Sequence, residues 1–395
     1  MIKRNHCTGM LCTLMVALLD ISNSTQAKAA NATAARIWDV GLTYKIDVMA
    51  PVAGGLRNKP YGLDNVDLVG TADLDRLAGW TGASAHIHLL NNNGGSPNDA
   101  AGTLQGIDNI EVSSQRLRLF EAWLNQQFGD NVGLRLGLYD LNSEFYSAPS
   151  AGLLLAPPFG IGSEIAATGP NGPSIFPSTA LAVRLRVEAH GYYTHFAVVN
   201  AAAGTVGDAG GVDVSFNSGA LVIGEVGHEG DVKISLGAWA YTRRQDDVRQ
   251  LDPNGEPLRR RAFGGYLLAD IPILNSGSSG YVSLFGRAGW SDGRTTPYSG
   301  GWQLGISVRE LIVGHPDSAL SLGIHEGRLS SAYRANERDA GGSPAKSERA
   351  IELTVSDRVA SRLTLQPDIQ WIFDPGGDRR RGSLVVMGLR TTLSL

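Results

Sequence analysis

Apolar and charged side chains alternate along the stretch Leu181-Ala-Val-Arg-Leu-Arg-Val-Glu188. Its odd-numbered residues are Leu or Val, whereas Arg184, Arg186 and Glu188 occupy even-numbered positions between and after them. A period of two places neighbouring side chains on opposite faces of a β-strand. The stretch therefore predicts a strand with one apolar face and one charged face.

The same alternation recurs along most of the chain. Turn residues separate the alternating segments, which are about eight to ten residues long. The pattern predicts about sixteen strands, which begin near residues 39, 66, 82, 115, 132, 181, 192, 220, 231, 262, 281, 301, 319, 347, 362 and 383.

The predicted connections differ in length in a regular way. Short ones lie near 190–191, 228–230 and 357–361, and long ones lie near 91–114, 141–180, 200–219, 242–261 and 326–346. An even-numbered outer-membrane barrel has short periplasmic turns and long extracellular loops. A secreted β-sandwich or β-solenoid is the alternative, although the chain shows no repeat of fixed period. We therefore expect an all-β fold, a transmembrane antiparallel barrel of about sixteen strands.

Composition excludes two other classes of protein. The only notable apolar run, residues 10–21, is shorter than the roughly 20 residues of a membrane-spanning helix. The net charge of -4 offers no basic face for nucleic acid. The mean hydropathy of -0.07 suits a sixteen-strand barrel, because its polar face lines a water-filled channel.

The cost of charge in the bilayer sets the direction of each face. An Arg or Lys that faces the bilayer midplane costs about 2–4 kcal/mol, so we expect the charged faces to point inward. Trp302 and Trp371 lie on the apolar faces and are expected in the interfacial aromatic belts. The residues expected to point inward are Arg135, Arg184, Arg186, Lys233, Arg287 and Arg309.

Two segments depart from the simple pattern. In residues 116–124 the alternation changes face, which predicts a β-bulge or a change of register. The connection at 141–180 is about forty residues long, apolar and rich in Pro and Gly, and is too long to be idle. We expect it to fold into the lumen as the constriction, and an exposed surface loop is the alternative.

The N-terminus has the features of a secretory signal. Lys3 and Arg4 precede the short apolar run, and Ala27-Lys-Ala29 fits a cleavage site of the A-x-A type. We expect residues 1–29 to be removed and residues 30–395 to form a single outer-membrane barrel domain. Both cysteines, Cys7 and Cys12, belong to the predicted signal, so we expect no disulfide in the exported chain.

Several stretches in this order resemble the carbohydrate-selective porins of Gram-negative outer membranes. The resemblance covers nearly the whole chain after the signal and implies a sixteen-stranded barrel that passes sugars by diffusion, without catalysis. Barrels of this kind commonly end in Phe, whereas this chain ends in Leu395. The stretches are Leu365-Gln-Pro-Asp-Ile-Gln-Trp-Ile-Phe-Asp-Pro-Gly-Gly377, Asp73-Leu-Asp-Arg-Leu-Ala-Gly-Trp80, Arg118-Leu-Phe-Glu-Ala-Trp-Leu-Asn-Gln-Gln-Phe128, Leu136-Gly-Leu-Tyr-Asp140 with Phe145, and Ile223-Gly-Glu225.

Sugar permeation calls for charged and amide groups that bind hydroxyls and for aromatic rings that match the apolar faces of a pyranose. Candidates are taken from the polar faces, with plain solvation of the lumen as the alternative role for each of them. Tyr241 is a further stacking candidate beside the two aromatic residues of the main set. The main set is Arg135, Arg184, Arg186, Glu188, Glu225, Lys233, Trp239, Tyr139, Asp368 and Gln370, with Glu144 and Glu164 from the infolded loop.

No catalytic motif is found, so we expect a channel rather than an enzyme, without a cofactor or bound metal. His86 and His88 fall on one strand face, where they fit a lumen or rim better than a metal site. Expected partners are small carbohydrates, outer-membrane lipids including lipopolysaccharide, and the barrel assembly machinery, with a homotrimer as a further candidate. The main alternative is a general or weakly ion-selective porin, and a barrel enzyme such as a lipase or protease is a distant one.

Overall fold

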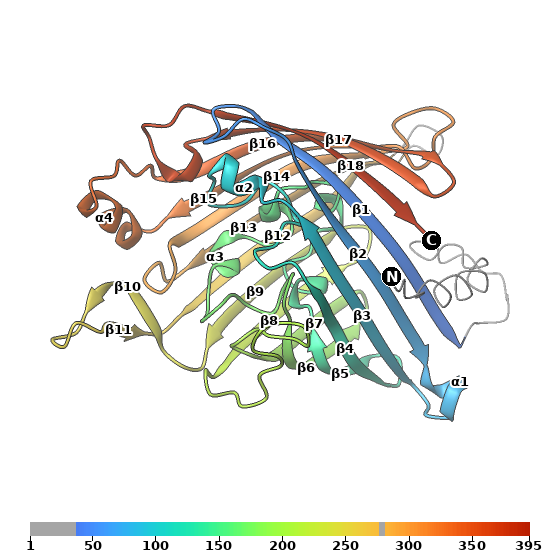
Figure 1. Cartoon of the computed structure of the whole chain (residues 1–395). Coiled ribbons are helices and arrows are strands. Elements are labelled where there is room, and N and C mark those ends of the chain that lie inside the picture. The colour runs from blue at the N-terminus through green and yellow to red at the C-terminus, as the bar shows by residue number, and fades with distance from the viewer. Residues whose placement is uncertain (1–36, 276–280) are drawn as a thin grey trace, which may run out of the picture.

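A closed antiparallel barrel of sixteen strands forms the body of the protein in residues 37–275 and 281–395, which are the residues that the computed structural model describes (Figure 1). The first and last strands close the barrel, with Thr43 opposite Ser394. The predicted signal lies outside the described residues. The strands are β1 (Trp38–Ala53), β2 (Tyr61–Asp73), β3 (Ala83–Gly94), β4 (Leu117–Phe128), β5 (Val132–Tyr139), β6 (Ala180–Ala189), β7 (Tyr192–Asn200), β8 (Ala220–Glu229), β9 (Lys233–Tyr241), β12 (Phe263–Asn275), β13 (Tyr281–Ser291), β14 (Tyr298–Arg309), β15 (Ala319–Leu329), β16 (Ser347–Ala360), β17 (Leu363–Phe373) and β18 (Leu384–Ser394), and β10 (Gln245–Leu251) pairs with β11 (Pro257–Arg260) outside the barrel.

The strand prediction is confirmed along the barrel. All predicted starts lie within three residues of the observed ones except that of β2, which begins at Tyr61, five residues early. Gly62 and Asp64 take outward positions in this first part of β2, so the apolar face that the alternation requires is missing there. The β10–β11 hairpin inside the predicted 242–261 loop was not expected.

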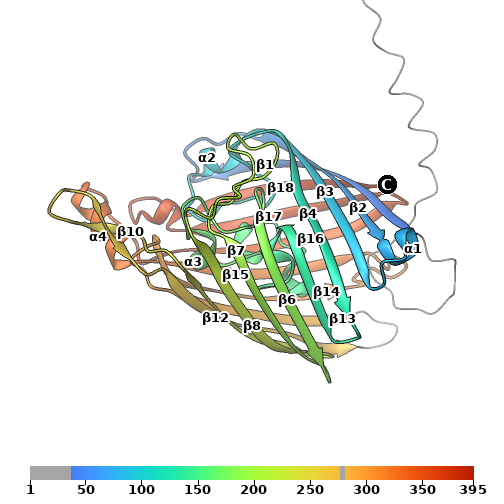
Figure 2. The same ribbon diagram turned by 90° about the horizontal axis from the view of Figure 1, so that it is seen from below.

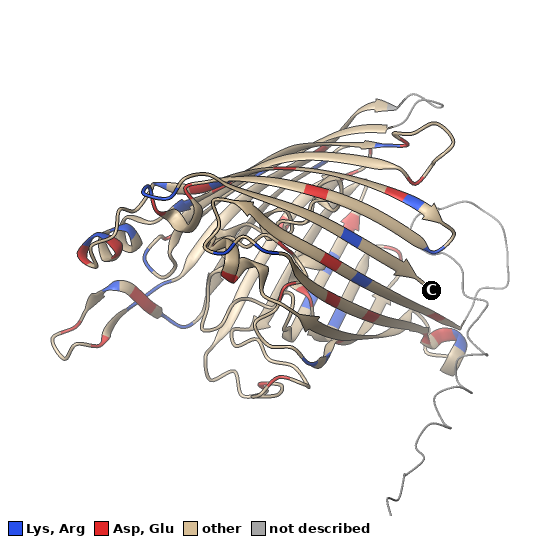
Figure 3. Ribbon diagram, turned by 45° about the horizontal axis from the view of Figure 1, so that its top comes forward, with Lys and Arg blue, Asp and Glu red and all other residues tan. Residues whose placement is uncertain are grey.

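Turn chemistry explains the short connections at one rim. His190 and Gly191 join β6 to β7, and both have positive φ, 53° and 79°. Two such residues form the tight turn whose twist matches a β-hairpin. Long connections occupy the opposite rim, where the β10–β11 hairpin and α4 (Ser331–Asp339) project beyond the strands and carry charges of both signs (Figure 3).

A bulge in β4 confirms the predicted change of face. His88 pairs with Glu121 and Leu89 pairs with Leu119, so Phe120 is the extra residue. Phe120 and Glu121 are consecutive and both buried. Before the bulge, Arg118 and Phe120 therefore point inward. After the bulge, Glu121 and every second residue that follows point inward.

The outer face is apolar, as predicted. On β6, Val183, Leu185 and Val187 are exposed while Arg184 points inward and is buried. Trp371 is exposed on the outside of β17, and Trp302 lies on the outer face of β14, in line with the exposed Leu304. Among the described residues, no helix has the length and hydropathy to cross a membrane.

The lumen holds the core of the protein, because long loops pack against the inside of the wall. The 140–179 connection folds inward, as predicted, and contains η1 (Leu141–Ser143), η2 (Pro149–Ala151), η3 (Pro157–Phe159) and α3 (Ser163–Ala166). Figure 2 shows α3 within the ring of strands. Buried residues of this loop, such as Ile165 and Phe159, form clusters with the inner faces of the strands.

A second long connection also folds inward, so the expectation of a single infolded loop is corrected. Residues 95–116, which include α2 (Pro97–Ala101), pack Ile107 and Ile110 against β1, β16, β17 and β18. Arg381 stabilises this arrangement from the last loop, because its Nη2 donates to the carbonyl oxygen of Ala101 at 2.7 Å. The expected loop at 326–346 begins later, since β15 continues to Leu329.

Candidate pore constriction

Three arginines of adjacent strands meet one carboxylate of the infolded loop. Arg135 on β5 lies directly opposite Arg184 on β6, and Arg186 lies two residues nearer the short-turn rim. Glu144 Oε2 lies 2.7 Å from Arg184 Nε, and its Oε1 lies 3.7 Å from Arg135 Nη1 and 4.0 Å from Arg186 Nη1. The site therefore brings three guanidinium groups around a single negative charge.

Local structure fixes the position of Glu144. The preceding turn η1 is capped by the side chain of Asp140, which accepts from Asn142 N at 2.9 Å. Tyr139, at the end of β5, donates its hydroxyl to Glu144 Oε2 at 2.5 Å. Burial raises the pKa of Glu144, but the guanidinium groups of Arg135 and Arg184 outweigh it and hold the pKa below its ordinary value. Glu144 is therefore a carboxylate at neutral pH.

The side chain of Arg135 is held by an aromatic stack. Its guanidinium lies 3.8 Å from the ring centroid of Trp123 on β4, and His86 on β3 stacks on that ring at 4.5 Å and 8°. Because β4 lies between β3 and β5, the two groups cover opposite sides of the indole. A cation placed over Trp is stabilised by the ring quadrupole, so Arg135 is restrained without being neutralised.

A second set of charges continues towards the short-turn rim. Arg186 pairs with Glu188 on its own strand, and its Nη2 lies 3.8 Å from Glu229 Oε2 on β8. The Lys233 ammonium lies 5.7 Å from the ring centroid of Tyr193. The carboxylates of Glu188 and Glu229 are among the more exposed groups of the lumen, with side-chain exposures of 44% and 49%. Charges of both signs thus line the path below Glu144.

Two candidate carboxylates, Glu225 on β8 and Glu164 on α3 of the infolded loop, are buried instead of facing open lumen. Glu225 is 1% exposed and accepts from the Tyr193 hydroxyl at 2.7 Å, the Tyr266 hydroxyl at 2.6 Å and Tyr146 N at 3.1 Å. Glu164 is 1% exposed and accepts from the Tyr146 hydroxyl at 2.7 Å. Glu225 thus connects the wall to the infolded loop, whereas Glu164 bonds within the loop, so the contacts of both carboxylates are with protein.

The aromatic candidates are also covered. Trp239, Tyr241 and Tyr139 point inward as the alternation indicates, yet all three are buried in the cluster formed by the wall and the 140–179 loop. Their rings pack against this loop because it brings apolar side chains such as Ile165 to them. Sequence reasoning placed these residues on the correct face, but not next to open channel.

Asp368 and Gln370 lie on β17, away from the arginine cluster. Gln370 Nε2 donates to the carbonyl oxygen of Ile107 at 2.8 Å and to Asp368 Oδ1 at 3.1 Å. Both side chains are buried, and Gln370 joins the wall to the second inward loop. The structure therefore separates the candidates into a group around Glu144 and a group buried against the infolded loops.

A row of lumen residues on β1 to β4 was missed by sequence reasoning. Lys45 Nζ lies 3.1 Å from Asp67 Oδ2, and His88 Nε2 lies 2.8 Å from Asp67 Oδ1. Glu121 Oε2 is 3.9 Å from both His86 Nε2 and His88 Nδ1. The paired histidines were the available signal, whereas the bulge in β4 concealed Glu121. Within residues 37–275 and 281–395, no group of three or more His, Cys, Asp or Glu is arranged to hold a metal ion.

These features define an outer-membrane channel of the porin class: an apolar exterior, a lumen lined with charge and a loop that narrows it. The chain belongs to the carbohydrate-selective porin, OprB family, whose family model matches residues 57–395. It is accordingly a sugar-preferring porin of the Gram-negative outer membrane.

Known relatives are similar over most of their length. Porin B of Pseudomonas aeruginosa strain PAO1 is 23% identical over 398 residues, covering 89% of this chain and 86% of that protein. The high-pH structure of Pseudomonas putida OprB has a TM-score of 0.81 at 19% identity and covers 91% of this chain and 94% of that one. An anion-selective porin from Comamonas acidovorans has a TM-score of 0.53 at 14% identity, with coverage of 91% and 100%.

Proposed function

We propose that this porin lets small neutral sugars, monosaccharides such as glucose and also short oligosaccharides, diffuse passively through a water-filled channel. The observation that carries the proposal is the convergence of Arg135, Arg184 and Arg186 on Glu144. Arg184 is nearly fully used by Glu144 and by the carbonyl oxygen of Gly133. Arg135 and Arg186 keep side-chain exposures of 16% and 32% and are the donors available to a passing solute.

Guanidinium groups suit sugar hydroxyls for a physical reason. Each presents five N–H donors in a fixed plane, and hydrogen bonds from a charged donor are stronger than those between neutral groups. The carboxylate of Glu188 lies beside Arg186 and accepts from a hydroxyl. A sugar that loses water at the narrow point therefore finds both donors and acceptors, which lowers the barrier to its passage.

Recognition here relies on hydrogen bonds more than on stacking. The indole of Trp123 is covered by His86 and Arg135, and the ring of Trp239 is buried. Arg135, Arg184, Arg186 and Lys233 outnumber the carboxylates of Glu144, Glu188 and Glu229 by one charge, so the same site also attracts anions weakly. A general or weakly ion-selective porin is the alternative, and block of the ion current by sugar separates the two.

The test is single-channel conductance in a planar bilayer, titrated with glucose, maltose and sucrose. We expect stable steps whose current falls saturably with sugar, and a weaker fall in the double variant Arg135→Gln, Arg186→Gln. Arg328→Gln is the matched control, because Arg328 lies on the outer face of β15 and is 64% exposed. Steps that no sugar affects would assign the chain to the general porins. No steps from folded protein would refute the channel itself.

Export and assembly complete the proposal. We propose that residues 1–29 are removed as a signal and that the barrel assembly machinery inserts residues 30–395 as one domain. A homotrimer is the candidate assembly, with lipopolysaccharide around its outer face. Mass spectrometry of the exported protein tests the removal of residues 1–29, and an intact N-terminus would contradict it. Light scattering in detergent tests the trimer, and the mass of a monomer would contradict it.

A further inference from the structure

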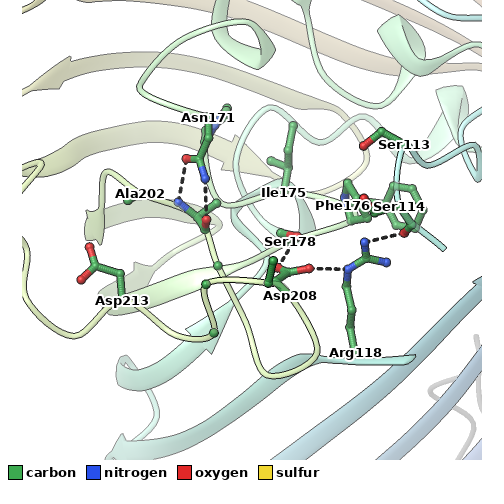
Figure 4. A pocket seen from close by; sticks show the side chains of 18 of the residues that line it. Ser113, Ser114, Arg118, Asn171, Ile175, Phe176, Ser178, Ala202, Asp208 and Asp213 are labelled. Carbon is green, nitrogen blue, oxygen red and sulfur yellow. Dashed lines mark hydrogen bonds and ion pairs between the residues drawn. The ribbon is translucent and has the colours of Figure 1, made fainter. Parts of the chain in front are cut away.

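A hollow of about 650 Å³ opens between three long loops, 95–116, 140–179 and 201–219 (Figure 4). It lies at the long-loop rim, which is the extracellular side of an outer-membrane barrel. Its volume is within the range of small-molecule sites, roughly 300–1,000 Å³. None of the candidates from the sequence lines it, so it is separate from the Glu144 cluster.

The floor of the hollow is a guanidinium–carboxylate pair. Arg118 Nε donates to Asp208 Oδ1 at 2.7 Å, and its Nη2 donates to the carbonyl oxygen of Ser114 at 2.7 Å. Asp208 Oδ2 accepts from the Ser178 hydroxyl at 2.6 Å. Arg118 is 3% exposed and its Nη1 has no hydrogen-bond partner. A buried donor without a partner carries a desolvation cost, so the polar groups of this lining are incompletely satisfied within the protein.

The loops that form the hollow are tied together before any ligand arrives. Asn171 Nδ2 donates to the carbonyl oxygen of Ala203 at 2.6 Å, and Ala203 N donates to Asn171 Oδ1 at 3.0 Å. This pair joins the 140–179 loop to the 201–219 loop, as the dashed lines at Asn171 in Figure 4 show. A cavity held in this way binds with little ordering cost.

The lining matches a neutral polyol better than an ion. Two arginines, Arg116 and Arg118, are balanced by two carboxylates, Asp208 and Asp213. Phe176 and Ile175 add an apolar wall beside these charged groups (Figure 4). Balanced charge attracts no net ion, whereas donors, acceptors and an apolar face together are what a sugar ring requires.

We propose that this hollow is a second carbohydrate site, which holds a small neutral sugar on the extracellular side before it reaches the constriction. The inference rests on the proposed function and adds a place where sugar is concentrated at the mouth. Arg116 and Asp213 bind the hydroxyls, and the apolar wall contacts the ring. Sugar arriving from outside then has a higher rate of entry than sugar arriving from the periplasmic side.

The test uses two kinds of variant. Arg116→Gln with Asp213→Asn removes charge from the lining, and we expect about tenfold weaker sugar affinity at the hollow, which is the loss of roughly one charged hydrogen bond. Gly210→Leu adds an apolar side chain to the lining of the hollow, and the backbone accepts it because a Cβ at this position meets no atom within 4 Å. Arg358→Gln is the matched control at the opposite rim, where Arg358 pairs with Asp317.

The readout is the rate of sugar block from each side of single channels of known orientation. Streptavidin bound to a biotinylated Asn254→Cys at the tip of the β10–β11 hairpin reports which side is extracellular. Both variants should lower the block rate from the extracellular side only and leave open-channel conductance unchanged. Equal block rates in wild type and variants would overturn the inference while the proposed function stands.

If no sugar blocks the wild-type channel, the proposed function fails. Calorimetry in detergent then tests independently whether the hollow binds sugar. Glucose or maltose binding that Gly210→Leu abolishes would support the hollow as a site. No binding by the wild-type protein would overturn it.

Discussion

Arg287 on β13 is predicted to hold the constriction loop closed. Its Nη1 donates to the carbonyl oxygens of Tyr146 and Gly160 at 2.9 and 2.8 Å, and its Nη2 donates to those of Pro158 and Phe159. The side chain is 3% exposed. One buried guanidinium thus joins both ends of the loop segment 146–160 to the wall. Arg287→Met keeps the apolar stem and removes every one of these donors.

The magnitude follows from the bonds. A hydrogen bond to a charged group contributes about 1.5–3 kcal/mol, and water in the lumen replaces part of each lost bond. We count only the two Nη1 bonds, each at the low end of this range. The free energy that favours the closed loop over the open one should then fall by about 3 kcal/mol. This value corresponds to a closed-to-open ratio that falls roughly 100-fold. The barrel itself should persist, because its strand pairing does not involve this side chain.

Hydrogen exchange followed by mass spectrometry measures the effect directly. Peptides from 140–179 should lose about two orders of magnitude of protection, and single-channel conductance should rise as the loop leaves the lumen. Arg358→Met is the control, since Arg358 lies at the short-turn rim, bonded to Asp317. Unchanged exchange in the 140–179 peptides of a correctly folded Arg287→Met protein would refute this reasoning.

Three further predictions concern charge, space and protonation. Glu144→Gln leaves the arginine cluster without its counter-charge, so the reversal potential in a KCl gradient should shift towards anions, and an unchanged potential would contradict the assigned constriction. Gly289→Ala should lower the hydrogen-exchange protection of the 140–179 peptides, because the new Cβ would lie 1.9 Å from Glu164 Oε1. Gly286→Ala is the control and should not lower it, because the nearest atom to its Cβ is 3.6 Å away. Equal effects of the two variants would argue against this packing. Burial raises the pKa of Glu111 to about 7, so the folded protein binds a proton at this carboxyl more readily than the unfolded chain does. The 95–116 loop should therefore lose stability as the pH rises from about 4.5 to 7. Hydrogen exchange corrected for intrinsic rates should show this loss, and Glu111→Gln should abolish the pH dependence.

The wall of the barrel is the part that sequence reasoning predicts well. Along β6 the alternation from Leu181 to Glu188 assigns every side chain to its observed face. The same period located the bulge in β4, where Phe120 and Glu121 are both buried. It failed only where polar residues occupy the outer face, as Asp64 does on β2. Alternation is reliable here because lipid and water meet opposite faces of one strand and penalise an error at every second residue.

The loops follow no such periodicity, which limits what sequence says about the lumen. Length and apolar content indicate that 141–180 folds inward, whereas nothing in the pattern of 95–116 distinguishes it from an exposed loop, although it also folds inward. That loop is held by contacts such as Gln105 to Glu348, which are 243 residues apart in the chain. Pairings of this separation leave no local pattern to read.

The alternation along the chain specifies the barrel, its sixteen strands and the face of each candidate side chain on a strand, because a period of two is a local property. The lengths of the connections specify the rim that carries the long loops. Tertiary structure alone decided which inward residues meet the channel. Arg135 and Arg186 stay partly exposed beside Glu144, whereas Glu225 and Trp239 are covered by the infolded loop. The physical reason is that a lumen residue faces water or protein according to where distant loops pack, and that packing is settled only when the barrel has closed.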